Sequence, residues 1–229
     1  MTTRSAHARA LFALPQGKAD PARRAALRSA RDAAKALASL QPGQIALLTG
    51  PSGSGKSTAL AMLRRRLARQ KRAVVRPPAH LSRRRATIDQ VGENLHDALH
   101  ILSAAGLAEA ALFPRPAGAL STGQLARLTI AAAMDRCTPG CVLIADEFAA
   151  VLDRVTARSL ASALARWCRA TNVTLIVAAA HDDTLEALRP DLLVALPLPG
   201  ERPSPPIILA RAPRGANPWP THCPADSPT

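Results

Sequence analysis

The chain has 229 residues, of which 30 are Lys or Arg and 16 are Asp or Glu, so its formal net charge is +14. A hydrophobic content of 48% excludes an intrinsically disordered chain, and no apolar run approaches the roughly 18 residues of a membrane span. We therefore expect a soluble, cytoplasmic protein. Its four cysteines show neither a disulfide framework nor standard zinc-ligand spacing, which favours reduced thiols in a reducing compartment.

The predicted elements begin with a basic, Ala-rich helix, which Asp20 and Pro21 would start and Pro42 would end. A buried strand over 45–48, a glycine-rich loop and a second helix follow. The later elements are a strand at 74–75, helices near 95–102 and from 121, a strand over 141–145, a helix over 155–170, a strand over 173–179 and an edge strand at 207–209. Strands that alternate with helices predict an α/β fold with a mostly parallel sheet and helices on both faces.

The basic residues are concentrated in the first part of the chain. Residues 1–88 hold 19 basic and two acidic side chains, whereas residues 89–229 hold 11 and 14. This excess favours a polyanion partner such as nucleic acid, or an acidic membrane surface. A genomic base bias toward Arg and Ala would produce the same excess, so both explanations stay open. The densest clusters are Arg64, Arg65, Arg66, Arg69, Lys71 and Arg72, and then Arg83, Arg84 and Arg85.

The glycine-rich loop fits the phosphate-binding pattern G-x-x-x-x-G-K-[ST]. It lies between a predicted strand and a predicted helix, where backbone N–H groups and the helix dipole can face phosphates. Lys56 is expected to reach the β- and γ-phosphates, and Ser57 to coordinate Mg²⁺. The predicted nucleotide-binding residues of this loop are Gly50, Pro51, Ser52, Gly53, Ser54, Gly55, Lys56, Ser57 and Thr58.

Two carboxylates follow the apolar strand over 141–145. Asp146 would emerge at the end of this strand beside the phosphate-binding loop and join the Mg²⁺ shell. Glu147 would then be placed to polarise the attacking water as general base.

A further motif starts the predicted helix at residue 121. Ser121 and Gln124 have the spacing of a capping box, which alone says nothing of function. The pentapeptide at 120–124, Leu-Ser-Thr-Gly-Gln, lies between the phosphate-binding loop and the acidic pair, and it resembles the LSGGQ signature of ATP-binding cassette (ABC) ATPases. Two later motifs match as well: the segment that ends at Asp153 resembles the D-loop, and His181 follows a strand as the switch histidine of that family does.

The resemblance covers roughly residues 41–196 and implies that two copies of the chain bind nucleotide between them. The signature of one copy would face the γ-phosphate held by Lys56 of the other, His181 would contact that phosphate within its own copy, and Asp153 would couple the two sites. The implied cofactors are ATP and Mg²⁺, and the implied partner is an ATP-dependent second copy. The signature residues assigned to the nucleotide are Ser121, Gly123 and Gln124.

The sequence departs from the family pattern at several points. Thr122 replaces the first glycine of the signature, and no aromatic residue lies at the usual adenine-stacking position. Gln90 is the only glutamine in the region of the Q-loop, which makes it a candidate for the Mg²⁺ shell. The segment from Gln90 to Ser121 is short, whereas transporter cassettes carry there a helical subdomain that grips the membrane partner.

These features favour a free-standing ABC-type ATPase. The alternatives are the ATPase subunit of a membrane transporter, an ATP-gated nucleic-acid clamp that uses the basic N-terminal part, and a P-loop kinase of a small molecule. We expect a basic, Ala/Arg-rich helical segment at 1–40, the ATPase domain at 41–196 and a Pro-rich tail at 197–229.

Overall fold

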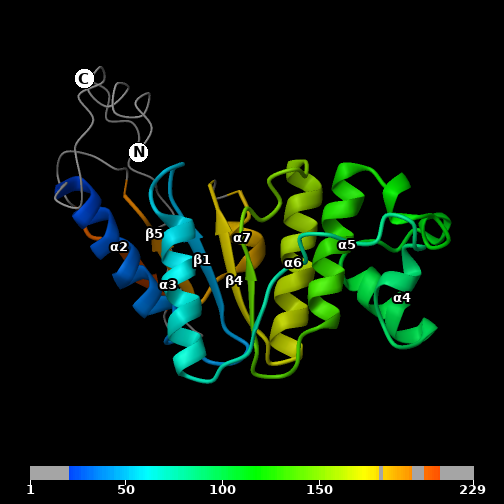
Figure 1. Cartoon of the computed structure of the whole chain (residues 1–229), viewed down its shortest axis with the longest axis horizontal. Coiled ribbons are helices and arrows are strands. Elements are labelled where there is room, and N and C mark those ends of the chain that lie inside the picture. The colour runs from blue at the N-terminus through cyan, green and yellow to red at the C-terminus, as the bar shows by residue number, and fades with distance from the viewer. Residues whose placement is uncertain (1–20, 181–182, 198–203, 212–229) are drawn as a thin grey trace, which may run out of the picture.

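The computed structural model describes residues 21–180, 183–197 and 204–211. Figure 1 shows the arrangement of its elements. The helices are α2 (Pro21–Leu37), α3 (Lys56–Arg69), α4 (Leu95–Ala104), α5 (Thr122–Asp135), α6 (Arg154–Ala170) and α7 (Leu185–Leu188), with short 3-10 turns η1 (Ile88–Gln90), η2 (Ala110–Leu112) and η3 (Ala117–Ala119). The strands are β1 (Ile45–Thr49), β2 (Val74–Val75), β3 (Val142–Ala145), β4 (Thr174–Ala179), β5 (Leu192–Ala195) and β6 (Ile207–Ala210).

The strands form one mixed sheet in the order β2-β3-β4-β1-β5-β6. Every pairing is parallel except the last, in which β6 runs antiparallel to β5. The predicted α/β fold with a mostly parallel sheet is therefore confirmed, and so is the edge strand. Because β1, β3 and β4 are parallel neighbours, the segments that follow them emerge at the same edge of the sheet.

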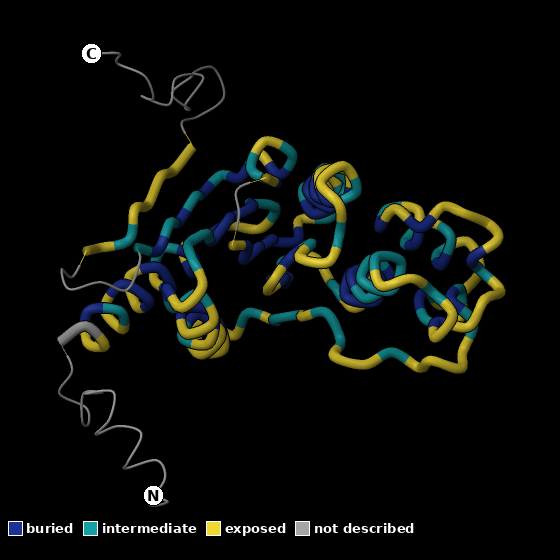
Figure 2. The backbone as a smooth tube through the Cα atoms, turned by 90° about the horizontal axis from the view of Figure 1, so that it is seen from above, coloured by how far each residue is buried: buried dark blue, intermediate teal, exposed yellow. Residues whose placement is uncertain are grey.

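Helices cover both faces of the sheet, and the alternation of side chains along β1 shows how. Ile45 and Leu47 point into a core that α4, α5, α6 and α7 close, whereas Ala46 and Leu48 point into a core closed by α2 and α3. All four side chains are fully buried. Figure 2 shows the buried strands between the two layers of helices. A strand that is apolar on both faces is the pattern of a central parallel strand.

Helix α2 belongs to the same core as the sheet. Ala30, Ala33 and Leu37 are buried against α3 and the sheet, so the N-terminal helix packs as part of the central fold. At the other end, the residues of β6 extend the sheet beyond residue 197. The described parts of the predicted segments 1–40 and 197–229, which include α2 and β6, therefore share the core or the sheet with residues 41–196.

The segment between β2 and α5 forms a small lobe beyond α5, at the right-hand end of Figure 1. Its loops are held together by Thr87, whose backbone N–H and hydroxyl both donate to the carbonyl of Arg115. Within the described ranges, no helix is long and apolar enough to cross a bilayer. Cys137, Cys141 and Cys168 are free thiols, and Cys223 lies outside the described residues.

Candidate functional site

The glycine-rich loop joins β1 to α3, as its motif predicts. Gly55 stands at the N-cap of α3 with a left-handed φ of 97°, which starts the helix at Lys56. At Gly50 the loop lies against the residue that follows β5. A Cβ at this position would stand 2.8 Å from the Leu196 carbonyl oxygen and 2.9 Å from Ser54 Oγ. Only glycine fits this approach.

The loop presents hydrogen-bond donors at the start of α3. The ammonium group of Lys56 lies over the loop and donates to the carbonyls of Gly50, at 2.5 Å, and Pro51, at 3.0 Å. The hydroxyl of Ser54 is buried under the loop without a partner among the described residues. Ser57 and Thr58 are exposed in the first turn, where the backbone N–H groups have no partner within the helix. This end of α3 is suited to an anion.

The two predicted carboxylates follow β3 in an irregular turn. Asp146 and Glu147 are exposed, and the carboxylate of Asp146 accepts from the backbone N–H of Glu147 at 3.1 Å. Phe148 is buried, and its N–H donates to the carbonyl of Ala178 on β4 at 3.1 Å. Glu147 itself has a left-handed φ of 52°. A non-glycine residue held in this conformation is typical of sites that position a side chain for function.

A cavity of about 460 Å³ brings the loop and this turn together. Lys56 and Ser52 line it from the loop, Glu147 from the turn after β3, and Ala180 from the end of β4. Its volume lies in the range of sites for small molecules. A cation and a carboxylate that line one cavity can bind an anionic group and act on a water beside it.

Arg154 lines the same cavity, although the sequence analysis did not single it out. Its guanidinium group pairs with Asp183 at 3.3 Å, and the side chain is 81% exposed. The sequence feature that could have pointed to Arg154 is its position directly after Asp153 in the D-loop segment, because residues next to a predicted site residue lie close to the same site.

Asp153 is the N-cap of α6 and accepts from the N–H of Thr156 at 2.9 Å. The hydrogen bonds from Thr156 hold the pKa of the Asp153 carboxyl group below its usual value. In the described residues this carboxylate therefore acts as a helix cap, and its predicted coupling role stays a prediction.

The signature segment caps α5. Ser121 Oγ accepts from the N–H of Gln124 at 3.2 Å, and Gln124 Oε1 accepts from the N–H of Ser121 at 3.0 Å, so the predicted capping box is confirmed. A Cβ on Gly123 would lie 3.2 Å from Leu152, which places the start of α5 against the D-loop segment of the same chain. Ser121 and Gly123 do not line the cavity.

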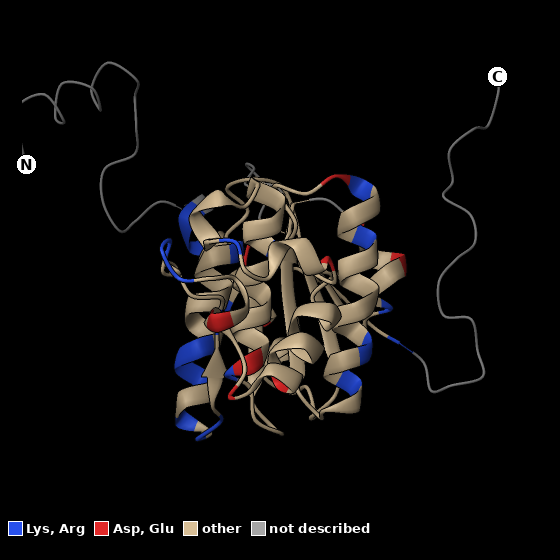
Figure 3. Ribbon diagram, turned by 90° about the vertical axis from the view of Figure 1, so that its right-hand side faces the viewer, with Lys and Arg blue, Asp and Glu red and all other residues tan. Residues whose placement is uncertain are grey.

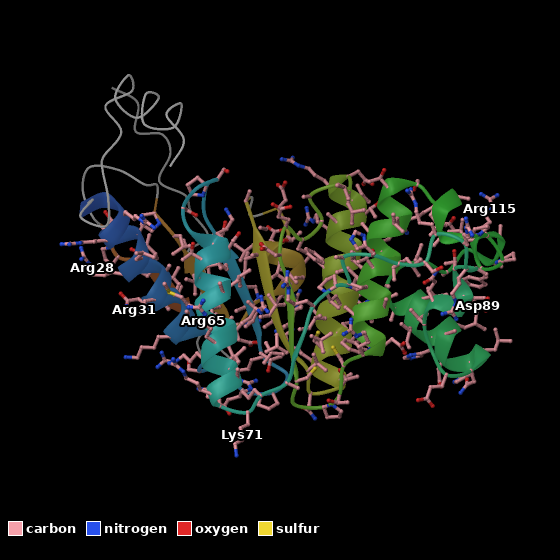
Figure 4. The ribbon with its side chains drawn as sticks, in the orientation of Figure 1. Arg28, Arg31, Arg65, Lys71, Asp89 and Arg115 are labelled. Carbon is pink, nitrogen blue, oxygen red and sulfur yellow. The ribbon has the colours of Figure 1, made fainter. Side chains whose placement is uncertain are left out.

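The remaining two predicted residues are not brought to the cavity. Gln90 donates through its side chain to the carbonyls of Ser82, at 2.6 Å, and Arg85, at 3.4 Å. Its neighbour Asp89 lies in the small lobe, at the end of the molecule away from α3 (Figure 4). The predicted place of Gln90 in a metal shell therefore has no support in this arrangement. His181 lies outside the described residues.

The donors that remain for Mg²⁺ are the Ser57 hydroxyl and the Asp146 carboxylate, both exposed and both following strands that end at one edge of the sheet. They suit this ion, which prefers oxygen ligands and usually takes only one or two from protein, with phosphates and water as the rest. No group of three or more His, Cys, Asp or Glu side chains in the described part of the chain could hold a metal ion alone.

Comparison with known families agrees with this geometry. Residues 40–188, more than half of the chain, match the family model described as AAA domain, which comprises P-loop ATPase domains. The chain belongs to the AAA domain family. The match spans the phosphate-binding loop, the capped start of α5 and the acidic pair, so this AAA domain contains the cavity described above. No curated protein matches the sequence.

Solved structures show which fold this AAA domain has. The dimeric structure of MJ0796, a bacterial ABC transporter cassette, is 19% identical and covers 69% of this chain and 83% of its own, with a TM-score of 0.54. The same cassette bound to ADP and Pi is 20% identical, with coverage of 69% and 82% and a TM-score of 0.53. A transporter described as metal-chelate type, in an inward-facing conformation, is 19% identical, with coverage of 75% and 73% and a TM-score of 0.54. The AAA domain thus has the fold of ABC ATP-binding cassettes, as the signature-like motif suggested.

Proposed function

We propose that this AAA domain binds Mg-ATP and hydrolyses it between two copies of the chain. The observation that carries the proposal is the cavity that Lys56 of the phosphate-binding loop and Glu147 of the turn after β3 line together. The N-terminus of α3 and the Lys56 ammonium group would hold the phosphates, since both offer donors and positive potential at one point.

The carboxylate of Glu147 would accept a proton from the attacking water. Its position at the cavity wall, held by the anchored Phe148 beside it, supports this role. Ser57 and Asp146 would hold Mg²⁺, which when bound offsets negative charge on the phosphates. Arg154 would add a second cation at the cavity when its exposed pair with Asp183 opens, because exposed ion pairs hold their partners weakly.

The second copy would supply the signature. Ser121 caps a helix whose N-terminus can meet an anion, yet it does not line the cavity of its own chain. A partner that places its Ser121 and Gly123 over the γ-phosphate would complete the site. The cassette MJ0796, which shares this fold, is described as a dimer in both of its structures.

Two substitutions test the ATPase. Lys56→Ala should abolish binding of a fluorescent ATP analogue, because it removes the cation that faces the phosphates. Glu147→Gln should retain nucleotide binding and lower turnover by a factor of about 10² to 10⁴, which is typical for loss of a general base. The matched control is Glu93→Gln, which makes the same change at an exposed site in the small lobe and should leave turnover unchanged. Unaltered turnover in Glu147→Gln would remove this residue as the base.

Oligomeric mass tests the shared site. Glu147→Gln should be monomeric without nucleotide and dimeric with Mg-ATP when measured by light scattering. A monomer under both conditions, with ATP bound, would leave Ser121 as a helix cap only and would favour phosphoryl transfer to a small acceptor within one chain.

A further inference from the structure

Four of the six residues that line a groove between α2 and α3 are arginines. Its volume is about 260 Å³, and Arg31 on α2 faces Arg65, Arg66 and Arg69 on α3 across it. All four side chains are exposed. Figure 4 shows Arg31 and Arg65 between the two helices, with Arg28 nearer the N-terminal end of α2 and Lys71 beyond the end of α3. We call Arg31, Arg65, Arg66 and Arg69 the arginine groove.

These four arginines differ in their surroundings from three arginines on α6. Figure 3 shows Lys and Arg on the outer surfaces of helices on both sides of the sheet. On the α6 side, Arg154, Arg158 and Arg169 each pair with a carboxylate. The arginine groove makes no ion pair within the described ranges, and the only acidic residue of α2 and α3 is Asp32.

Packing alone does not account for this concentration of charge. Arg66 and Arg69 lie in the last turn of α3, where a cation stabilises the helix dipole. That argument does not extend to Arg31, which lies in the middle of another helix. Like charges brought together across two helices repel each other unless an anion lies between them.

We propose that the arginine groove binds the phosphate backbone of duplex DNA, independently of base sequence. Arginine offers a planar pair of donors that matches a phosphate group. Arg65 and Arg69 are one helical turn apart, about 6 Å along α3, whereas the phosphates of one DNA strand rise by about 3.4 Å each. The spacing of Arg65 and Arg69 is close to two such steps, so the two side chains can contact phosphates two nucleotides apart on one strand.

The composition of the groove favours duplex DNA over single-stranded nucleic acid and over an acidic membrane surface. It includes no aromatic side chain, so it lacks the stacking platform on which single strands depend. Its apolar residues are Ala34 and the half-buried Met62, and neither is a large exposed anchor for an acidic membrane. Arginine without aromatic or bulky apolar neighbours is suited to a regular phosphate backbone.

The test is fluorescence anisotropy with a labelled duplex of random sequence, about two helical turns long, between about 50 and about 200 mM NaCl. The full-length wild-type chain should bind with an affinity that falls as salt rises. The triple variant Arg31→Glu, Arg65→Glu, Arg69→Glu should lose about tenfold or more in affinity. Its salt slope should be smaller by about 2.7, because each phosphate contact contributes about 0.9.

The matched control carries the same charge change elsewhere. Arg83, Arg84 and Arg85 are exposed in the loop whose backbone pairs with residues 117 and 118 of the small lobe. Changing these three to Glu should keep the affinity within about threefold of wild type, since they lie at the end of the molecule where Arg115 is labelled in Figure 4. An equal loss in both triples would show an effect of net charge and overturn the groove as a site.

Two further arms complete the test. The second triple variant, Arg31→Gln, Arg65→Gln, Arg69→Gln, removes the same three charges without adding acidic side chains. It should also weaken DNA binding, and binding as tight as that of the wild type would overturn the groove as a site. Vesicles of phosphatidylcholine with phosphatidylserine replace the duplex as probe. Binding to these vesicles but not to the duplex, or no binding to the duplex at the lowest salt, would overturn the proposal.

The Lys56→Ala variant separates this proposal from the proposed ATPase. It should still bind DNA, so failure of the ATPase proposal and failure of the groove proposal are distinguishable.

Discussion

Ser121 has two assigned tasks, and one substitution separates them. Its hydroxyl caps α5 in the structure, and in the proposed dimer it faces the γ-phosphate held by the other copy. Ser121→Ala removes the cap, which typically costs about 1 kcal/mol. For a chain of this length such a loss lowers the midpoint of thermal unfolding by about 2–4 °C. Ser121→Asp keeps the cap, since Asp and Ser are equally good at this position and a carboxylate also favours the helix dipole.

The aspartate should nonetheless prevent assembly. Because Ser121 is exposed, an effective dielectric constant of about 20 applies, and two like charges about 4 Å apart then repel by about 4 kcal/mol. Each of the two sites would lose about a thousandfold in affinity. In the Glu147→Gln background, Ser121→Asp should therefore unfold at the wild-type temperature by circular dichroism and stay monomeric in Mg-ATP by light scattering.

Two results would refute this reasoning. If Ser121→Asp in the Glu147→Gln background dimerises with ATP as readily as Glu147→Gln alone, Ser121 does not approach the γ-phosphate. If Ser121→Asp loses as much thermal stability as Ser121→Ala, the hydroxyl does not stabilise α5 as a simple acceptor.

Two other substitutions test the framework of the site. Gly50→Ala should lower nucleotide affinity and thermal stability, both measured by calorimetry, because its Cβ would stand 2.8 Å from the Leu196 carbonyl oxygen. Gly140→Ala is the control: Gly140 also has a positive φ, but a Cβ there meets no atom within 4 Å. Its loss of stability therefore reports the cost of a positive φ without a steric clash. Asp191→Ala should lower stability by about 1–3 kcal/mol in urea unfolding, because the buried N–H of Ile45 loses its acceptor at 2.9 Å and Arg169 loses its ion-pair partner at 3.3 Å. Asp191→Asn keeps an acceptor oxygen and should lose less than half as much; equal losses would contradict the hydrogen-bond argument.

The sequence predicted the parts of the fold that local patterns determine. β1, β3 and β4 were predictable because each is a short apolar run beside a motif or a helix. The sequence did not predict β5 or α7. Residues 192–195 are apolar, but a short apolar run close to prolines shows no clear hydrophobic periodicity, and the four residues of α7 are too few to show one. The order of the strands depends on which distant segments pair, and no local pattern carries that information.

The candidate site shows the same division. The phosphate-binding loop and the acidic pair were predictable because each motif fixes its own backbone position at a strand end. Gln90 shows the limit of sequence order, since its place in the chain suited a Q-loop while its side chain bonds within the small lobe. Arg154 shows the converse, because it belongs to no motif and yet lines the cavity from the first turn of α6. The arginine groove depends on α2 packing against α3, which charge counting alone does not reveal.

Helix α3 begins at Lys56 and ends at Arg69, and its 14 residues span about 21 Å. It packs on α2 through buried alanines such as Ala30 and Ala59, which let the helices lie close together. Because α3 is one continuous helix, a nucleotide that displaced the whole helix along its axis would also move Arg65 and Arg69 relative to Arg31. Thermodynamic linkage then makes the two binding events reciprocal: whatever factor ATP applies to polyanion affinity, the polyanion applies to ATP. Measuring either coupling would give the other.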